Sequence, residues 1–404
     1  MFLANSPYAD TYINFFHTKI DFNVGAWKLS HSLHHWINDG LMAIFFFMIG
    51  LEVKREILIG ELASIKQAML PVLAAIGGMV LPALIYISIN SGTAGVNGWG
   101  IPMATDIAFA ISALIILGKR VSPSLVSFLV ALAIVDDIGA VLVIAIFYTD
   151  TISVLPLALA GISFLIMLAF NRFGIHAILP YFIMGLFLWF FMLESGVHAT
   201  MAGVIAAITI PSRPKFNPID FTHHAKNLLD EYDNYPVATD HTMHENQKAI
   251  LLNIKDKIDS VGSPSAKLEH SLHLPVSLLV IPVFALANAG ISINFSSIGD
   301  SILSPVSVGV IAGLLLGKVF GIAGVAYIAI KLGVAKLPEN TSMSQVIGVS
   351  FLGAIGFTMS ILVAELAFFG NPTLIFEAKV GILIASLIGG VCGYIWLRIG
   401  SKGI

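Results

Sequence analysis

Long apolar stretches, separated by short polar segments, run through most of the chain. A helix needs roughly 17–25 residues to cross the hydrocarbon core of a bilayer, and the hydrophobic pattern predicts about eleven helices of this kind. The stretch at 197–211 is short, so it predicts a half-length or tilted helix. The predicted spans cover residues 36–58, 67–90, 101–118, 125–148, 153–171, 176–193, 197–211, 271–292, 305–330, 345–369 and 377–399.

Polar segments divide the chain into an N-terminal part, two groups of spans and a connecting loop. Residues 1–35 precede the first span, and residues 212–268 form a long polar loop. The loop separates a first group of spans at 36–211 from a second group at 269–404. This organisation predicts an all-α fold.

The polar loop contains one helical pattern and several histidines. Apolar residues at 250, 251, 254, 258 and 261 have helical spacing, which predicts a short amphipathic helix. The histidines of 223–224 and 241–244 have two interpretations, metal ligands or a solvated loop. Their polar, acidic context without cysteine favours the solvated loop.

Composition agrees with a membrane protein and excludes several other classes. The 404-residue chain is 57% hydrophobic and 11% charged, with a mean hydropathy of +0.90, which indicates an integral membrane protein. A net charge of −3 without a basic run argues against nucleic acid as a partner. Cys392 is the single cysteine, so the chain can form neither an internal disulfide nor a cysteine metal site.

Lysine and arginine gather in alternate loops, which predicts the orientation of the chain. Most of the 21 basic residues fall on one side, and the positive-inside tendency makes that side cytoplasmic. The C-terminus is then cytoplasmic, and an odd number of spans places the N-terminal segment 1–35 outside. Because no signal peptide is visible, we expect one more hydrophobic helix before Met1 in the complete protein.

Asp136 and Asp137 lie mid-way along the predicted span 125–148. One charged Asp near the bilayer centre costs ~2.5–3.5 kcal/mol on insertion-based scales, so an adjacent pair indicates proton or ion handling. Neighbouring helix residues point about 100° apart. One acid can therefore face a water-filled funnel while the other faces Lys318 on a neighbouring helix. The pair should titrate as a coupled unit.

Lys318 also lies deep inside a predicted span, too far from either end for its side chain to reach the interface. Gly313, Gly317 and Gly321 surround it in sequence and allow another helix to approach closely. A pairing or functional role is therefore the better interpretation.

Two spans contain helix-weakening residues. Gly98, Gly100 and Pro102 precede Asp106, a pattern that fits a broken helix as well as an ordinary Gly/Pro entry into a span. The second span has Gly348, Gly353 and Gly356 ahead of Thr358 and Ser360. Two interrupted segments in the two halves of a chain are typical of transporter sites built from discontinuous helices.

Several strings in this sequence resemble the NhaA-type sodium/proton antiporter family, from about residue 30 to 400. The resemblance implies an inverted-repeat fold with two discontinuous helices that cross. The strings are WINDGLMAIFFFMIGLEVKRE (36–56), AAIGGMVLPALIY (74–86), IPMATDIAFAI (101–111), ALAIVDDIGAV (131–141), SGVHATMAGVI (195–205), LEHSLH (268–273), PVFALANAG (282–290), GLLLGK (313–318) and GAIGFTMSI (353–361).

The resemblance also implies site residues. Asp137 would be the principal cation and proton carboxylate, with Asp136 as its partner, so that these two acids hold Na⁺ or Li⁺ transiently and Asp136 pairs with Lys318 when the cation is absent. Thr105 would also belong to the cation site. Asp106 at the first break would balance helix-end charges near the second break, which contains Gly353, Gly356 and Thr358. The residues implied in the response to pH are Glu52, Lys54, Arg55, Glu56, Glu269, His270, His273 and His198.

The implied activity is pH-regulated, electrogenic export of Na⁺ or Li⁺ against protons by alternating access, in a bacterial inner membrane. The partners would be these ions, the lipid bilayer and a second copy in a homodimer, with no cofactor. Two features depart from the family pattern: the family's first helix is missing before Ala4, and the loop before Glu269 is unusually long.

Two other functions remain as alternatives. A sodium-coupled symporter of an organic solute would need a binding pocket, and no cluster of basic or aromatic residues at membrane depth indicates one. An intramembrane aspartyl protease would need a Tyr-Asp motif, a Gly-x-Gly-Asp motif and a later Pro-Ala-Leu. Here Thr105 precedes Asp106, Val135 precedes the paired acids, and the Pro-Ala-Leu at 82–84 comes before both.

Overall fold

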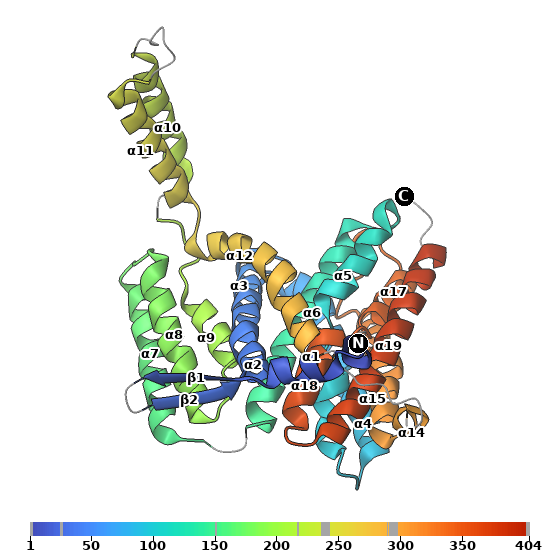
Figure 1. The fold of residues 1–404 in the computed structure, drawn as a ribbon. Coiled ribbons are helices and arrows are strands. Elements are labelled where there is room, and N and C mark those ends of the chain that lie inside the picture. Colours follow the sequence, from blue (N-terminus) through green and yellow to red (C-terminus); the bar gives the residue numbers. More distant parts are fainter. Residues whose placement is uncertain are drawn as a thin grey trace.

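The computed structural model describes residues 3–24, 27–149, 152–215, 218–235, 243–288, 290 and 298–400, and these are mostly helical (Figure 1). Among them, 8 helices are long and apolar enough to cross a membrane, or 9 if one bent pair counts as a single span, by length and composition alone.

The helices follow the predicted stretches closely. The first group contains α3 (Met42–Ile59), α4 (Ile65–Asn90), α5 (Ile107–Ile116), α6 (Pro123–Phe147), α7 (Val154–Arg172), α8 (Ile178–Ser195) and α9 (Met201–Thr209). The second contains α12 (Pro264–Pro275), α13 (Ile281–Asn288), α14 (Ile298–Ile302), α15 (Pro305–Ala312), α16 (Val325–Lys331), α17 (Met343–Leu352), α18 (Phe357–Ala367) and α19 (Pro372–Gly400).

Two of the predicted spans do not meet the criteria of length and composition. The stretch 36–58 becomes α3, whose last turns carry Glu52, Lys54, Arg55 and Glu56, too many charges for an apolar span. The stretch 197–211 becomes α9, which has only 9 residues, as the half-length alternative predicted.

The all-α prediction agrees with the mostly helical structure, but the N-terminal segment also contains a short β-hairpin. After α1 (Ala9–His17), strands β1 (Lys19–Val24) and β2 (Trp27–Ser32) form an antiparallel hairpin that pairs Lys19 with Ser32. Apolar residues alternate at Ile20, Phe22 and Val24, the period of a strand. The chain then enters α2 (Leu33–Trp36) and a π-helical turn, η2 (Ile37–Leu41), which leads into α3.

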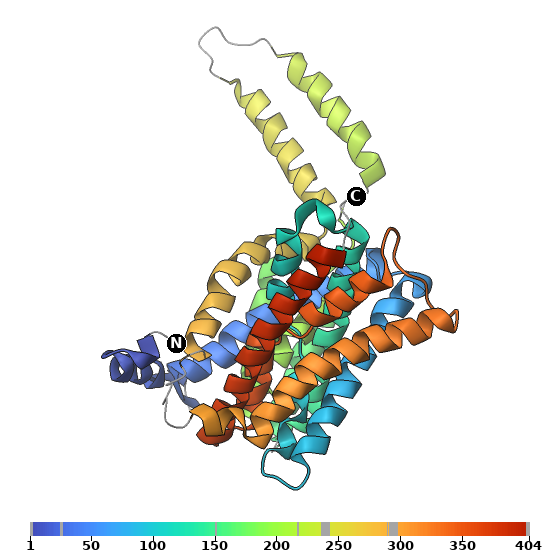
Figure 2. The ribbon, with the colours of Figure 1, turned by 90° about the vertical axis from the view of Figure 1, so that its right-hand side faces the viewer.

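The long polar loop contains two helices, where one was predicted. Helix α10 (Pro218–Asp233) packs against α11 (Glu245–Val261), which includes the predicted amphipathic segment. Figures 1 and 2 show this pair projecting away from the other helices. The exposed His223 and His224 lie on α10, whereas residues 241–242 of the second histidine group lie outside the described residues.

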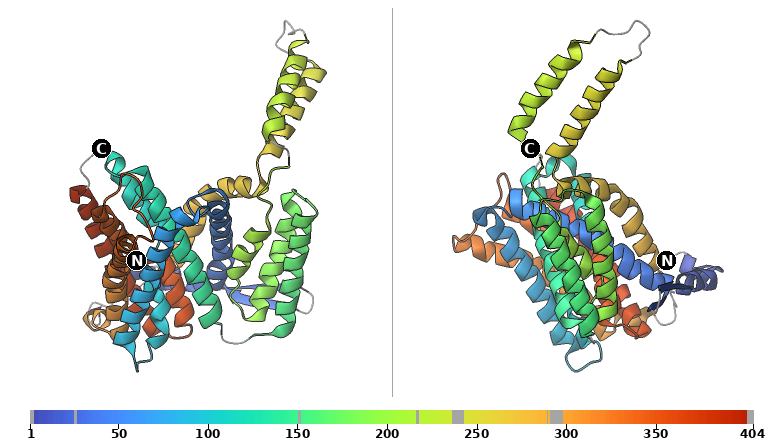
Figure 3. Two further views of the ribbon diagram at one scale, coloured as in Figure 1. Left: turned by 180° about the vertical axis from the view of Figure 1, so that it is seen from behind. Right: turned by 90° about the vertical axis from the view of Figure 1, so that its left-hand side faces the viewer.

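The membrane helices form two groups. Helices α7, α8 and α9 pack on one side of α3, and α4, α15, α17, α18 and α19 lie on the other side of α6 (Figures 1 and 3). The small residues of the 313–324 segment allow it to lie very close to α4. A Cβ added at Gly317 would lie 2.5 Å from the Cα of Pro82, and one added at Gly321 would lie 2.7 Å from the carbonyl carbon of Gly77. The close helix contact predicted at these glycines is therefore confirmed.

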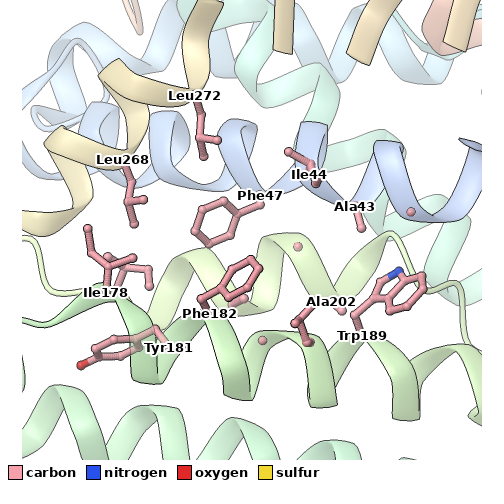
Figure 4. A pocket seen from close by; sticks show the side chains of 16 residues that line it. Ala43, Ile44, Phe47, Ile178, Tyr181, Phe182, Trp189, Ala202, Leu268 and Leu272 are labelled. Carbon is pink, nitrogen blue, oxygen red and sulfur yellow. The ribbon is translucent and has the colours of Figure 1, made fainter. Parts of the chain in front are cut away.

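An apolar pocket of about 450 Å³ lies between α3, α8, α9 and α12, with Phe47, Phe182 and Leu272 in its lining (Figure 4). Tyr181 and Trp189 also line it, but their polar atoms are bonded to the main-chain carbonyls of Ile175 and Asp39. No ionisable carboxyl or amine lines this pocket, so it does not provide ligands for a cation.

Candidate functional site

Two interrupted segments meet at the centre of the molecule. The 3₁₀ helix η3 (Val96–Met103) ends in extended backbone at Ala104, and α5 begins after Asp106. Helices α17 and α18 are bent by 50° across residues 353–356. The Asp106 N–H donates to the carbonyl of Ile355 at 2.6 Å, so the two breaks contact each other directly.

The Asp106 carboxylate lies between the N-terminal ends of α5 and α18. Its Oδ1 accepts from the Phe109 N–H at 3.2 Å, and its Oδ2 accepts from the N–H of Thr358 at 3.0 Å and from the Thr358 hydroxyl. Helix N-termini present unpaired N–H groups and a partial positive charge. A buried carboxylate at this point therefore satisfies both helix ends.

Asp136 has two polar neighbours, each from a different segment. Its Oδ2 accepts from the hydroxyl of Thr105 at 2.7 Å and forms an ion pair with Lys318. The Thr105 hydroxyl also lies 2.9 Å from the carbonyl of Gly353, which joins the first break to the second. Both side chains of the ion pair are fully buried, and the pairing of Lys318 with one of the adjacent acids agrees with the prediction.

Asp137 lies one residue further along α6 and is completely buried. Neither of its carboxyl oxygens has a hydrogen-bond partner among the described residues, and the same is true of Oδ1 of Asp136. Buried polar atoms in folded proteins normally have partners, and an uncompensated buried charge is costly. This group of unpartnered oxygens is therefore suited to hold a proton or a small cation.

These oxygens are hard ligands of the kind that small hard cations prefer. In the described part of the chain, no group of three or more His, Cys, Asp or Glu side chains is arranged to hold a metal ion. A cation bound at Asp136 and Asp137 would therefore need further oxygens, and the nearest hydroxyl in this hydrogen-bond network is that of Thr105.

Lys318 is held in an unusual stretch of helix. Two π-helical turns, η6 (Gly313–Gly317) and η7 (Phe320–Gly324), flank it. Turns of π-helix are rare in proteins, and those that occur frequently lie at functional sites. In the sequence, only the repeated glycines hint at these turns.

A second cluster of charges lies at the end of α3. Arg55 contacts the carboxylates of Glu56 at 2.8 Å, Glu269 at 3.0 Å and Glu52 at 4.0 Å. Three acids predicted for the pH response are thus brought together by one guanidinium. Lys54 is directed elsewhere and donates to the carbonyls of Ile208, at 2.7 Å, and Ile210.

The predicted histidines do not join this charge cluster through a hydrogen bond or ion pair among the described residues. His270 and His273 are exposed on α12. His198 lies in the turn between α8 and α9, and its Nε2 is 2.9 Å from the carbonyl oxygen of Tyr148 at the end of α6. No motif in the sequence singled out Tyr148.

Two stacked histidines, which no motif in the sequence singled out, lie in β2 and α2, before the start of α3. The rings of His31 and His35 lie 4.2 Å apart, and His35 Nε2 is 3.0 Å from Oδ2 of Asp39 without the alignment of a hydrogen bond. Burial lowers the pKa of His31, and His35 lowers it further. Burial also lowers the pKa of His35, so both imidazoles favour the neutral form.

A cleft of about 830 Å³, lined by both polar and apolar side chains, approaches α6 from the end where the helix begins. Its lining includes Ser124, Ser127 and Ala131 of α6, together with the beginning of α4 and residues 333–339. Ala131 is five positions before Asp136, a distance of ~7.5 Å along a helix.

Comparison with known proteins places the chain in a family. Residues 1–397 match the family model described as Na⁺/H⁺ antiporter 1. The chain belongs to this antiporter family. Membership agrees with the resemblance found in the sequence, and together with the apolar helices it makes this member of the antiporter family a multi-pass membrane protein.

Relatives with similar sequences carry the same description. The chain is 69% identical over 402 residues to the Na⁺/H⁺ antiporter NhaA of Sulfurimonas denitrificans, an alignment that covers 100% of this chain and 90% of the relative. It is 48% identical to Na⁺/H⁺ antiporter NhaA 1 of Saccharophagus degradans, over 98% of this chain and 86% of the relative. The antiporter NhaA of Dichelobacter nodosus is 46% identical, with 98% and 85% covered.

Proposed function

We propose that this chain is a secondary transporter that exports Na⁺ or Li⁺ in exchange for protons. The observation that carries the proposal is the unpartnered, buried carboxyl group of Asp137 beside the Asp136–Lys318 ion pair. Membership of the Na⁺/H⁺ antiporter family supports the same ions.

In this proposal a cation and protons compete for one site. Asp137 holds a proton when the cation is absent, and Lys318 neutralises Asp136. An entering cation takes oxygens of Asp136, Asp137 and Thr105 as ligands, which displaces the proton of Asp137 and separates Lys318 from Asp136. We expect one monovalent cation to exchange for more than one proton, which makes the exchange electrogenic.

The contacts between the breaks support alternating access. We infer that η3–α5 and α17–α18 are the two crossing discontinuous helices of an inverted-repeat transporter. Asp106, Thr358, Gly353 and Gly356 hold these breaks together, so that the site can move as a unit. The 830 Å³ cleft beside Ser127 and Ala131 is a candidate route between the site and one side of the membrane.

The Arg55 cluster is the candidate regulator. Among the three acids around Arg55, Glu269 is the one on α12, so its protonation would weaken the ion pair that joins α12 to α3 and give a dependence of transport on pH. Glu52 and Glu56 lie on α3 beside the same guanidinium. His270 and His273 lie on the same helix as Glu269, α12. We propose that this side faces the cytoplasm of a bacterial cell, as does the C-terminus, and that the protein is a homodimer in the inner membrane.

Exchange in proteoliposomes tests the proposal. A pH gradient, acid inside, quenches a pH-sensitive dye, and Na⁺ or Li⁺ added outside should restore the fluorescence without any organic solute. Asp137→Asn should abolish this recovery, because an amide can neither release a proton nor supply a charged ligand. Asp230→Asn, in the exposed α10, is the matched control and should keep it. Recovery retained by Asp137→Asn, or a requirement for a solute, would overturn the assignment.

A further inference from the structure

Tyr148 contacts residues from both groups of membrane helices. It follows the last residue of α6, the helix that carries Asp136 and Asp137. Its side chain contacts η3, and its main chain contacts the turn between α8 and α9. Because it lies 12 positions from Asp136, or ~18 Å along a helix, Tyr148 can influence the ion site only through other residues.

The side-chain end of this connection fixes the first broken segment. The Tyr148 hydroxyl donates to the carbonyl of Asn97 at 2.8 Å and accepts from the N–H of Gly100 at 3.2 Å. A Cβ added at Gly100 would lie 2.7 Å from the phenol oxygen, so this approach needs glycine. The segment held in this way continues within five residues to Thr105, whose hydroxyl is bonded to Asp136.

The main-chain end holds the other group of helices. The Tyr148 carbonyl oxygen accepts from Nε2 of His198 at 2.9 Å. His198 belongs to the group formed by α7, α8 and α9, whereas η3 packs against α4 and α18 in the other group.

We propose that Tyr148 is a positioning residue that links His198 to the ion site. It holds η3, and with it Thr105, at a fixed position relative to the α8–α9 turn. The inference rests on the proposed exchange activity, since any movement of one helix group relative to the other must either preserve the contacts of Tyr148 or break them. His198 then acts on the site through Tyr148, not by contact with the ion.

Tyr148→Phe removes the hydroxyl and keeps the ring. A single hydrogen bond of this kind changes an equilibrium by about three- to tenfold, so the Na⁺ concentration for half-maximal exchange should rise by about that factor while the maximal rate stays similar. Gly100→Ala displaces the phenol and should give the same effect. Tyr181→Phe, which removes a phenol bond to Ile175 within the α7–α9 group, is the matched control and should leave the value unchanged.

A double-mutant cycle tests the link itself. His198→Ala should raise the half-maximal Na⁺ concentration, His198→Gln should restore it by keeping an N–H donor, and Tyr148→Phe combined with His198→Ala should be no worse than the more affected single variant. Unchanged affinity in Tyr148→Phe, or additive effects in the double variant, would overturn the inference. Absence of exchange by the unsubstituted protein would instead overturn the proposed function.

Discussion

At the scale of single residues, the proposed ion site depends on the unequal surroundings of two adjacent acids. Asp136 shares one oxygen between Thr105 and Lys318, whereas Asp137 has no partner among the described residues. The 100° turn between neighbouring helix positions separates them. As a result, one acid is neutralised by the protein, and the other is left for a proton or a cation.

Removing one partner of the buried Lys318–Asp136 ion pair should destabilise the protein more than removing both charges. Lys318→Met leaves the Asp136 carboxylate buried without its partner, which destabilises a protein by ~3–5 kcal/mol. Adding Asp136→Asn removes the stranded charge, so the double variant should recover most of the lost thermal stability. Thermal unfolding of the purified protein in detergent measures both effects.

Lys331→Met serves as the control, because Lys331 is exposed and its loss should leave the melting temperature nearly unchanged. If the double variant were as unstable as Lys318→Met alone, the destabilisation would come from lost packing around Lys318 and not from the unpaired charge.

Sequence alone identified the acids, Thr105, Lys318 and both breaks, because charges and glycines are conspicuous in apolar spans. The resemblance implied that Lys318 pairs with Asp136, as the structure shows, whereas helix geometry alone left open which of the two acids faces Lys318, since this depends on how α6 is rotated. The sequence did not reveal the contact of Tyr148 with Gly100 or the cluster of three acids around Arg55. Those contacts join residues far apart in the chain and leave no periodic signal.

At the scale of elements, glycines control how closely the segment that carries Lys318 packs on α4. Gly317 and Gly321 face Pro82 and Gly77 at distances that exclude a side chain, whereas Gly324 has no neighbour within 4 Å of an added Cβ. The two π-helical turns that include or adjoin these glycines, η6 and η7, lie on either side of Lys318. The close packing therefore helps to set the depth and direction of its ammonium group.

Gly317→Ala should push the segment away from α4. Overpacking of this kind costs about 1–3 kcal/mol, and it should also weaken Na⁺ binding because Lys318 moves relative to Asp136. Gly324→Ala adds the same methyl group where space is open, and helix propensity should leave stability unchanged or raise it by on the order of 0.5–1 kcal/mol. Melting temperatures of Gly317→Ala and Gly324→Ala measure the difference, and equal values would contradict the packing role of Gly317.

Element boundaries show where sequence reasoning ended. Long spans such as α6 and α19 were predicted well, because their apolar pattern is continuous. The β1–β2 hairpin was missed, since its short alternation follows a polar helix outside the membrane spans. The position of helix α9 was predicted correctly, but the choice between a half-length and a tilted helix stayed open. The apolar residues at 197–211 do not show where the hydrogen-bonded turns begin.

At the scale of the whole molecule, the α10–α11 pair stands apart from the helices that build the site (Figure 2). The two ends of this insertion meet, because the Ser265 N–H donates to the carbonyl of Pro211 at 3.1 Å. The chain therefore leaves the membrane helices and returns to them at nearly one point. The two groups of spans can pack around the site without the insertion.

Replacing residues 216–260 with a short Gly/Ser linker should therefore preserve exchange. Closing the chain with a short flexible linker costs little conformational entropy, and the proposed ion site lies outside α10 and α11. Exchange in proteoliposomes, compared with the intact chain, measures the result. Loss of exchange by a shortened protein with an unchanged melting temperature would show that the insertion takes part in transport.

The central claim is that Na⁺ and protons share the site at Asp136 and Asp137. It is tested most directly by adding Na⁺ to purified protein in weakly buffered detergent solution and recording the protons released. Na⁺ should acidify the solution with the unsubstituted protein, and Asp137→Asn should show no proton release. Na⁺ binding without proton release, or release that persists in Asp137→Asn, would contradict it.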